Sequence, residues 1–212
     1  MEMCNLGIFV PVYYSEESVA KTLMRLTSMS YTGIKPRLFI CVTGMRESFK
    51  SFVEAYINEY SSDSVTIPIF DRVELIVDDL TFDPTRMIND VIHDNPDLQF
   101  ISVVEPDIGI EDTECFLKFV TIYHDYDFKR KLGGVCTENA KHKILGDHIR
   151  WQVEHNTVVR SLDGDGFGNG VLFTERSTWK TVNGFIGRDY TNEFSKKCFR
   201  HGLLVTYAEG IK

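Results

Sequence analysis

The fold predicted for this chain depends most on the stretch LQFISVVEPDIGIED, Leu98–Asp112. Phe100–Val104 is a short apolar run rich in β-branched residues, which is typical of a strand buried on both faces. The strand must end at Glu105, Pro106 and Asp107, because proline has no N–H to donate to a sheet. Side chains two residues apart on an extended chain point the same way, so both acids can point beyond the strand end. An acidic turn that contacts only water is the alternative.

The place of these two acids indicates what they could bind. In open α/β sheets, ligands bind beyond the carboxyl ends of the strands. Two converging carboxylates are hard oxygen ligands, suited to Mg²⁺ or Mn²⁺ that carries a diphosphate. The sequence therefore predicts a metal-assisted phosphate site at Glu105 and Asp107.

Strands and helices alternate on both sides of this stretch. Buried strands are predicted at Leu6–Val12 and Arg37–Thr43, and a third strand at Val73–Val77. Helices are predicted after Ser15, around Phe49–Ile57, at Thr85–His93 with Asp83 and Pro84 at its start, and at Ile110–Tyr123. This alternation over residues 6–123 indicates the α/β class, with a parallel sheet and right-handed crossovers.

The second half of the chain has a different pattern. Strands are predicted at Leu132–Cys136, Gly170–Thr174 and Leu203–Tyr207, a short helix from Ser177 to a turn at Asn183-Gly184, and a helix at Thr191–Arg200. Residues 137–160 are mixed and polar, and no element is assigned to them. DGDGFGNG, Asp163–Gly170, is interpreted as a loop that closes over a ligand, or as a plain flexible connection.

Charge and cysteine content exclude several classes of protein. The net charge of −8 argues against general nucleic-acid affinity. No apolar run approaches the ~20 residues of a membrane helix, and the first residues do not resemble a signal peptide. The five cysteines are scattered without a CxxC pair, which favours reduced thiols and a cytoplasmic protein. The histidines lack HxxxH or HExxH spacing, so a zinc enzyme is not expected.

Four segments, in order, resemble the GT-A-fold glycosyltransferases of family 2 and their relatives. LGIFVPVYYSEESVAKTLMRL (6–26) resembles their opening strand, Pro-Val-Tyr turn and helix. RMINDVIHDNPDLQFISVVEPD (86–107) resembles their Arg-x-x-Asn helix and the strand that delivers a metal-binding Asp-x-Asp. GNGVLFTERSTWKTVNGF (168–185) is similar to the strand and turn before an acceptor-site Gly-Gly-Phe. NEFSKKCFRHG (192–202) resembles the acidic helix that follows.

This resemblance implies a mixed, mostly parallel sheet flanked by helices, in a single GT-A-like domain over residues 1–212. Residues 1–123 would form the nucleotide-sugar-binding half and residues 124–212 the acceptor-side half. The implied reaction moves a sugar from a nucleotide-sugar donor to an acceptor hydroxyl. Mn²⁺ or Mg²⁺ would be held by Asp107, with Glu105 in place of the first Asp of the motif.

The resemblance also implies roles for further residues. Pro11, Val12, Tyr13 and Arg86 would contact the donor together with Glu105. An inverting enzyme needs a carboxylate within reach of the acceptor hydroxyl. Asp189 is the first choice for this general base and Glu193 the second, and a retaining mechanism stays open if neither is in place.

The chain departs from the family pattern at three places. Residues 42–46 (VTGMR) lack the acids that hold the base and ribose in relatives, so the donor base is unassigned. Tyr190 and Thr191 stand where relatives have Glu-Asp. The late metal-ligating histidine of some relatives is not evident, unless His201 or an earlier histidine substitutes.

The acceptor and the competing functions remain open. A basic cluster could attract a phosphorylated glycan or a modified nucleic-acid base; it comprises Lys129, Arg130, Lys131, Lys141, Lys143 and Arg150. A nucleotidyltransferase can share this architecture, but it usually has a Gly-rich basic loop after its first strand, which PVYYSEES lacks. A non-catalytic binding module on the same fold is the other alternative. Nothing in the sequence predicts the oligomeric state.

Overall fold

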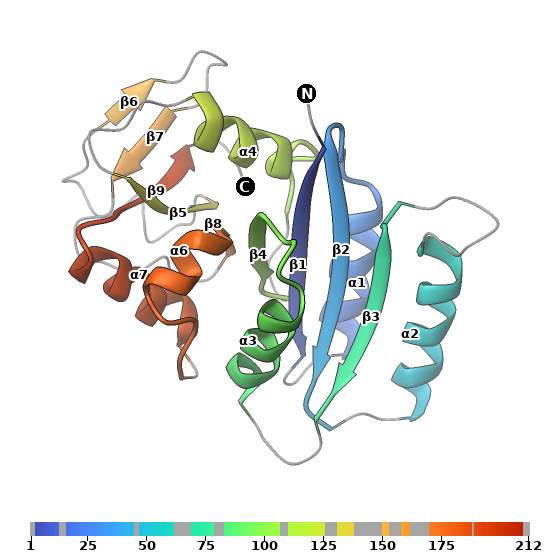
Figure 1. Cartoon of the computed structure of the whole chain (residues 1–212). Coiled ribbons are helices and arrows are strands. Elements are labelled where there is room, and N and C mark those ends of the chain that lie inside the picture. The colour runs from blue at the N-terminus through green and yellow to red at the C-terminus, as the bar shows by residue number, and fades with distance from the viewer. Residues whose placement is uncertain are drawn as a thin grey trace.

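The computed structural model describes residues 3–12, 16–44, 47–61, 69–78, 83–106, 110–125, 131–137, 150–152, 158–161, 170–187 and 189–209. Its nine strands form one sheet in the order β3-β2-β1-β4-β8-β5-β9-β7-β6 (Figure 1). No helix in these ranges is long and apolar enough to cross a membrane.

The first half of the sheet is parallel, as predicted. Its strands are β1 (Cys4–Val12), β2 (Ile34–Val42), β3 (Arg72–Val77) and β4 (Phe100–Val104). The helices are α1 (Glu16–Thr27), α2 (Glu47–Tyr60), α3 (Pro84–Asp94) and α4 (Cys115–Asp125). α3 begins as its sequence predicts, because the Asp83 side chain accepts a hydrogen bond from the Thr85 N–H at 2.9 Å. The carboxyl ends of β1–β3 point to the bottom of Figure 1.

The second half of the sheet is mixed. Its elements are β5 (Leu132–Thr137), β6 (Arg150–Gln152), β7 (Val158–Ser161), β8 (Val171–Glu175), α6 (Arg176–Thr181), α7 (Tyr190–Arg200) and β9 (Leu204–Glu209). β8 runs antiparallel to both of its neighbours, β4 and β5. Its first residue therefore lies at the same edge of the sheet as the last residue of β4. This reversal places the chain after β8 so that α6 and α7 follow at the side of α3 (Figure 1).

Two apolar cores cover the two faces of the sheet, because side chains alternate along each strand. On one face, even-numbered residues of β1 and β2 pack against α1, α2 and α4. On the other face, Phe9 and Phe39 stack at 4.9 Å and pack with residues of α3 and α7. Strands β1, β2 and β4 are buried on both faces, which explains their nearly unbroken apolar sequences.

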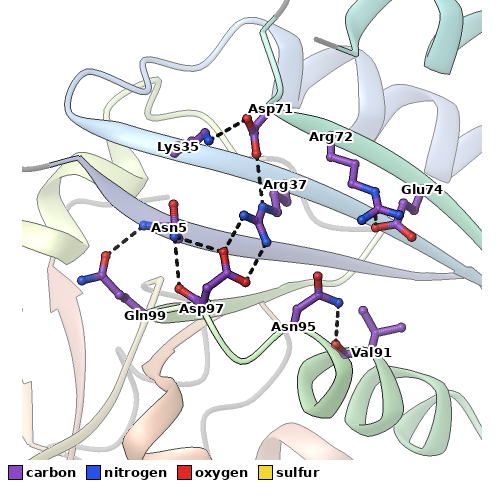
Figure 2. Close-up of polar contacts among 10 residues, drawn as sticks. All are labelled: Asn5, Lys35, Arg37, Asp71, Arg72, Glu74, Val91, Asn95, Asp97 and Gln99. Atoms are coloured by element: carbon purple, nitrogen blue, oxygen red, sulfur yellow. Dashed lines mark hydrogen bonds and ion pairs between the residues drawn. The ribbon is translucent and has the colours of Figure 1, made fainter. Parts of the chain in front are cut away.

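A polar network ties the amino ends of the strands together (Figure 2). The Arg37 guanidinium donates to both carboxylate oxygens of Asp97, at 3.0 and 2.6 Å, and to Asp71 at 3.2 Å. Asp97 precedes β4 and Asp71 precedes β3, so the Arg37 side chain on β2 binds the segments that lead into both of these strands. Asn5 adds a hydrogen bond to the Asp97 carbonyl at 3.1 Å. The network lies at the edge opposite to Glu105.

We expect Arg37→Gln to destabilise the protein by about 1 kcal/mol at neutral pH, since Asp97 is half exposed and solvent weakens the pair. The hydrogen bond from Arg37 lowers the pKa of Asp97 below its usual value. Stability from this pair is therefore fully present above the usual carboxyl range and is lost as the pH falls through the lowered pKa. Urea unfolding at several pH values should show that the free energies of unfolding of the wild type and of Arg37→Gln become equal in acid. A gap that stays constant down to pH ~2 would contradict this.

Some predicted boundaries are wrong for local reasons. The helix predicted from Ile110 begins at Cys115, because Asp112 accepts a hydrogen bond from the Glu114 N–H at 2.9 Å and forms a turn. Ser177 does not open α6, which starts at Arg176 directly after β8. The strands β6 and β7 were not predicted. Ser15, the predicted cap of α1, lies outside the described residues.

Candidate functional site at the carboxyl ends of the strands

Glu105 lies at the carboxyl end of β4, where the sequence predicts it. Its N–H donates to the carbonyl of Gly170 at 3.3 Å, so the residue that precedes β8 meets the end of β4 at this point. The Glu105 side chain is half-buried. Gly170 is required there, because a Cβ on it would lie 2.6 Å from the Thr137 hydroxyl oxygen. Three strands, β4, β8 and β5, thus converge closely around this carboxylate.

Tyr190 connects Glu105 to the second half of the chain. Its hydroxyl donates to Glu105 Oε1 at 2.5 Å. Tyr190 is 1% exposed and is the first residue of α7. Its ring also meets the edge of Phe185, with ring centroids 6.1 Å apart. The start of α7 and the turn before it are therefore held against the end of β4.

Helix α1 holds both ends of the segment that contains Asp107. The Thr22 hydroxyl donates to the carbonyl of Pro106 at 2.8 Å. Arg25 donates through Nε to the carbonyl of Ile110 at 2.5 Å and through Nη2 to the carbonyl of Glu111. Asp107 itself lies outside the described residues. The two ends on either side of it are nevertheless anchored to the same helix.

A three-way hydrogen-bonded clamp holds the turn that resembles the family's Gly-Gly-Phe. Asn89 Oδ1 accepts hydrogen bonds from Trp179 Nε1 and from the Phe185 N–H, both at 3.0 Å. Asn89 Nδ2 donates to the Phe185 carbonyl at 2.9 Å. The turn residues Asn183 and Gly184 have φ of 60° and 68°. A Cβ on Gly184 would lie 2.8 Å from Asn89 Oδ1, so this clamp requires glycine there.

Lys197 of α7 closes the other side of this turn. Its Nζ donates to the carbonyls of Asn183 and Gly184, at 3.2 and 2.9 Å. Partial desolvation lowers the pKa of Lys197. The turn is thus held by α3 on one side and by α7 on the other.

The two predicted general bases lie on the first turn of α7. Asp189 is exposed, sits next to Tyr190, and accepts a hydrogen bond from Asn192 at 2.8 Å. Glu193 accepts from Lys196 Nζ at 2.7 Å, and this hydrogen bond lowers the pKa of Glu193. Glu193 is thus held in an ion pair with Lys196, whereas the partner of Asp189 is the neutral Asn192 amide.

The predicted donor-binding residues are less tightly grouped. Pro11 and Val12 are buried strand residues at the end of β1. Arg86 is 70% exposed at the start of α3 and lies 3.8 Å from Asp90, the surface ion pair that the sequence also allows. Tyr13 lies outside the described residues, as do the Asp163–Asn169 part of the glycine-rich loop and Lys129, Arg130, Lys141 and Lys143 of the basic cluster.

Three residues near the site had no predicted role. Tyr190 was noted only as a departure from the family pattern, and Asn89 only as part of an Arg-x-x-Asn pattern. Asp78 follows β3, and its N–H donates to the carbonyl of Val42 at 3.0 Å. It therefore stands beside the end of β2. An acid directly after a predicted strand was the available signal for Asp78.

The described residues fit a divalent metal only in part. Glu105 is a half-buried carboxylate at the expected edge, and its chemistry suits a hard cation. Within the described ranges, no three His, Cys, Asp or Glu side chains gather into a metal-binding group. Thiol chemistry is disfavoured, since burial raises the pKa of Cys41 and of Cys198 to about 12.

Comparison with known proteins supports the fold but no sequence family. No family model matches the chain, and no curated protein matches it by sequence. Among solved structures, the mannosyltransferase PcManGT from Pyrobaculum calidifontis, in complex with GDP-Man and Mn²⁺, superposes with a TM-score of 0.69 at 11% identity. That match covers 98% of this chain and 57% of PcManGT. GalNAc-T7 with UDP, GalNAc and Mn²⁺ has a TM-score of 0.65 at 8% identity, covering 97% and 42%.

A nucleotide-activating enzyme shares the architecture more distantly. A cytidylyltransferase from Leptospira borgpetersenii has a TM-score of 0.51 at 7% identity. That match covers 95% of this chain and 73% of the cytidylyltransferase. The chain spans about half the length of the two transferases above. These comparisons confirm the GT-A fold, a mostly parallel sheet flanked by helices.

Proposed function

We propose that this protein is a nucleotide-sugar-dependent glycosyltransferase. The observation that carries the proposal is the contact between Tyr190 and Glu105. It joins the strand end expected to bind the donor to the helix start expected to bind the acceptor, within a GT-A fold. PcManGT and GalNAc-T7 share this fold and bind a nucleotide or nucleotide-sugar together with Mn²⁺.

Glu105 and Asp107 would hold the divalent ion, Mn²⁺ or Mg²⁺. When bound, the ion offsets negative charge on the leaving diphosphate. Tyr190 orients Glu105 through its hydroxyl, and α1 keeps the ends of residues 106–111 in place through Thr22 and Arg25. Arg86, at the start of α3, would approach the diphosphate by exchanging its exposed partner Asp90.

Asp189 is proposed as the general base that takes the proton of the acceptor hydroxyl. It is exposed to solvent and adjoins Tyr190, so a ligand that contacts Glu105 lies close to its helix turn. Its partner, the neutral Asn192 amide, does not neutralise its charge. Asp78 beside β2 is proposed to contribute to recognition of the nucleotide.

Tyr190→Phe tests the link between the two halves, because it removes one hydroxyl and keeps the buried ring. We expect the affinity for Mn²⁺ in the presence of UDP to fall by about 10-fold, as for other residues that orient metal ligands. Isothermal calorimetry measures this directly. Tyr56→Phe is the matched control, since Tyr56 is equally buried and its hydroxyl bonds the Leu23 carbonyl on the far face. Unchanged Mn²⁺ affinity in Tyr190→Phe would remove its proposed role.

The function itself is tested by calorimetry with a panel of nucleotide-sugars, each with and without Mn²⁺. Metal-dependent binding of at least one of them, with slow release of free sugar, is the expected result. Binding of free nucleoside triphosphates in preference to every nucleotide-sugar would favour a nucleotidyltransferase, the activity class that the Leptospira fold neighbour brings into view. No binding to any member of the panel would favour a non-catalytic module.

Acceptor and location are proposed from chemistry alone. The acceptor is a glycan or a modified nucleic-acid base that offers a hydroxyl group. All five cysteines are buried free thiols, which supports a cytoplasmic, reducing location.

A further inference from the structure

Two hollows flank helix α6, away from the carboxyl ends of the strands. One, of about 430 Å³, lies between α3 and α6 and reaches Asn183 and Gly184. The other, of about 820 Å³, lies toward the amino ends of β1 and β4 and includes Gln99 and His124. Neither includes Glu105, and the first is bounded by the clamp residues Asn89, Trp179 and Gly184.

The two hollows meet at a pair of cations. Arg176 and Lys180 line both of them, whereas Trp179 lines only the first and Ser177 only the second. At 100° per helical residue, the order around α6 is Trp179, Arg176, Lys180, Ser177. The cations therefore form a ridge with one hollow on each side.

The charge of this ridge is not cancelled by neighbouring acids. Within the described residues, neither Arg176 nor Lys180 forms an ion pair. One acid lines each hollow, Asp90 the first and Glu175 the second, but each faces another cation: Asp90 lies 3.8 Å from Arg86 and Glu175 lies 3.8 Å from Lys131. An overall acidic protein thus exposes a local positive site here.

The ridge is also held in a fixed arrangement. Arg176 donates through Nε to the carbonyl of Ile92 at 3.4 Å, and no hydrogen bond from its terminal nitrogens is found among the described residues. The Trp179 indole is half-buried, and its N–H is held by Asn89 at 3.0 Å. A fixed indole face beside two cations suits a sugar ring that carries an anionic group.

We propose that these hollows bind a phosphate-bearing carbohydrate chain, which would be the acceptor. The phosphate contacts Arg176 and Lys180, and a neighbouring sugar packs on Trp179. The first hollow ends at Gly184, next to Phe185, whose ring contacts Tyr190 and so leads to Glu105. The identification of this carbohydrate as the acceptor rests on the proposed function. Its binding to the hollows requires neither metal nor donor.

The test is a nuclear magnetic resonance titration of ¹⁵N-labelled protein with glucose 6-phosphate, without Mn²⁺ and without nucleotide-sugar. The chain has two tryptophans, so its indole N–H region is simple, and Trp179→Phe assigns the resonance. We expect a saturable shift of the Trp179 indole signal at millimolar probe. The variant Arg176→Gln with Lys180→Gln should weaken the binding by at least about 10-fold.

The matched control is Lys21→Gln with Lys50→Gln, which removes the same charge from α1 and α2 on the opposite face. It should bind glucose 6-phosphate normally. The inference is overturned by the absence of a saturable shift, by equal weakening in the control, or by equal binding of methyl glucoside. Equal binding of inorganic phosphate would overturn the carbohydrate assignment.

Donor binding by the Arg176 and Lys180 double variant separates this inference from the proposed function. If the wild-type protein binds a nucleotide-sugar but does not bind glucose 6-phosphate at the hollows, only the inference about the hollows is wrong. If the protein binds glucose 6-phosphate at the hollows but binds no nucleotide-sugar, the transferase proposal is wrong, and so is the identification of the bound carbohydrate as the acceptor.

Discussion

Asp107→Asn should lower the rate of sugar transfer, or of donor hydrolysis, by about 10³-fold at saturating Mn²⁺. The change keeps the size of the side chain and removes the negative charge that would hold the ion against the diphosphate. Initial rates with the nucleotide-sugar found by calorimetry give the measurement. The loss should fall on the catalytic step as well as on metal affinity, because charge on the leaving group grows in the transition state.

The control for this experiment is Glu111→Gln, four residues further along the same connection. Glu111 is exposed, and only its backbone carbonyl is used, by Arg25. It should retain full activity and full Mn²⁺ affinity. Activity of Asp107→Asn within a few-fold of the wild type would show that the ion, if used, is not held there.

Asn89→Leu should lower the free energy of unfolding by about 3 kcal/mol. The leucine has a similar size but leaves the Phe185 N–H, the Phe185 carbonyl and the Trp179 N–H without their partner. Each buried polar group that loses its partner costs about 1–3 kcal/mol, and partial access to water keeps the total near the lower end. Urea unfolding, followed by tryptophan fluorescence, measures the change.

The same substitution at Asn192 provides a comparison on the next helix. Asn192 makes one side-chain hydrogen bond, to the exposed Asp189, so Asn192→Leu should cost less than about 1 kcal/mol. If the two variants were equally stable, the clamp around Phe185 would have no special energetic role.

The parallel half of the fold could be predicted because its signals are local. Phe100–Val104, Leu38–Val42 and Leu6–Val12 are almost continuous apolar runs, and the structure buries each of them on both faces. Asp83 and Pro84 marked the start of α3 correctly for the same reason. By contrast, β6 and β7 lie in a mixed, polar stretch, where no periodicity separates strand from loop.

The acids of the candidate site could be predicted from the sequence, but the residues that hydrogen-bond to them and position the site could not. Glu105 could be placed because it ends a strand. Its partner Tyr190 could not, since the two residues are 85 apart in sequence and nothing local links them. Asn89 likewise meets Phe185 across 96 residues. Such pairings depend on which strands become neighbours, and that is decided by the packing of the whole sheet.

The reversed strand β8 has a consequence for the protein as it is synthesised. On one side β4 pairs with β1, but on the other its partner is β8, and Ser102 reaches the carbonyl of Leu172 across 70 residues. At about 5–20 residues per second, the ribosome needs several seconds to make the intervening chain. During that time β4 is an apolar strand with an open edge, the kind of surface that other nascent chains and chaperones bind.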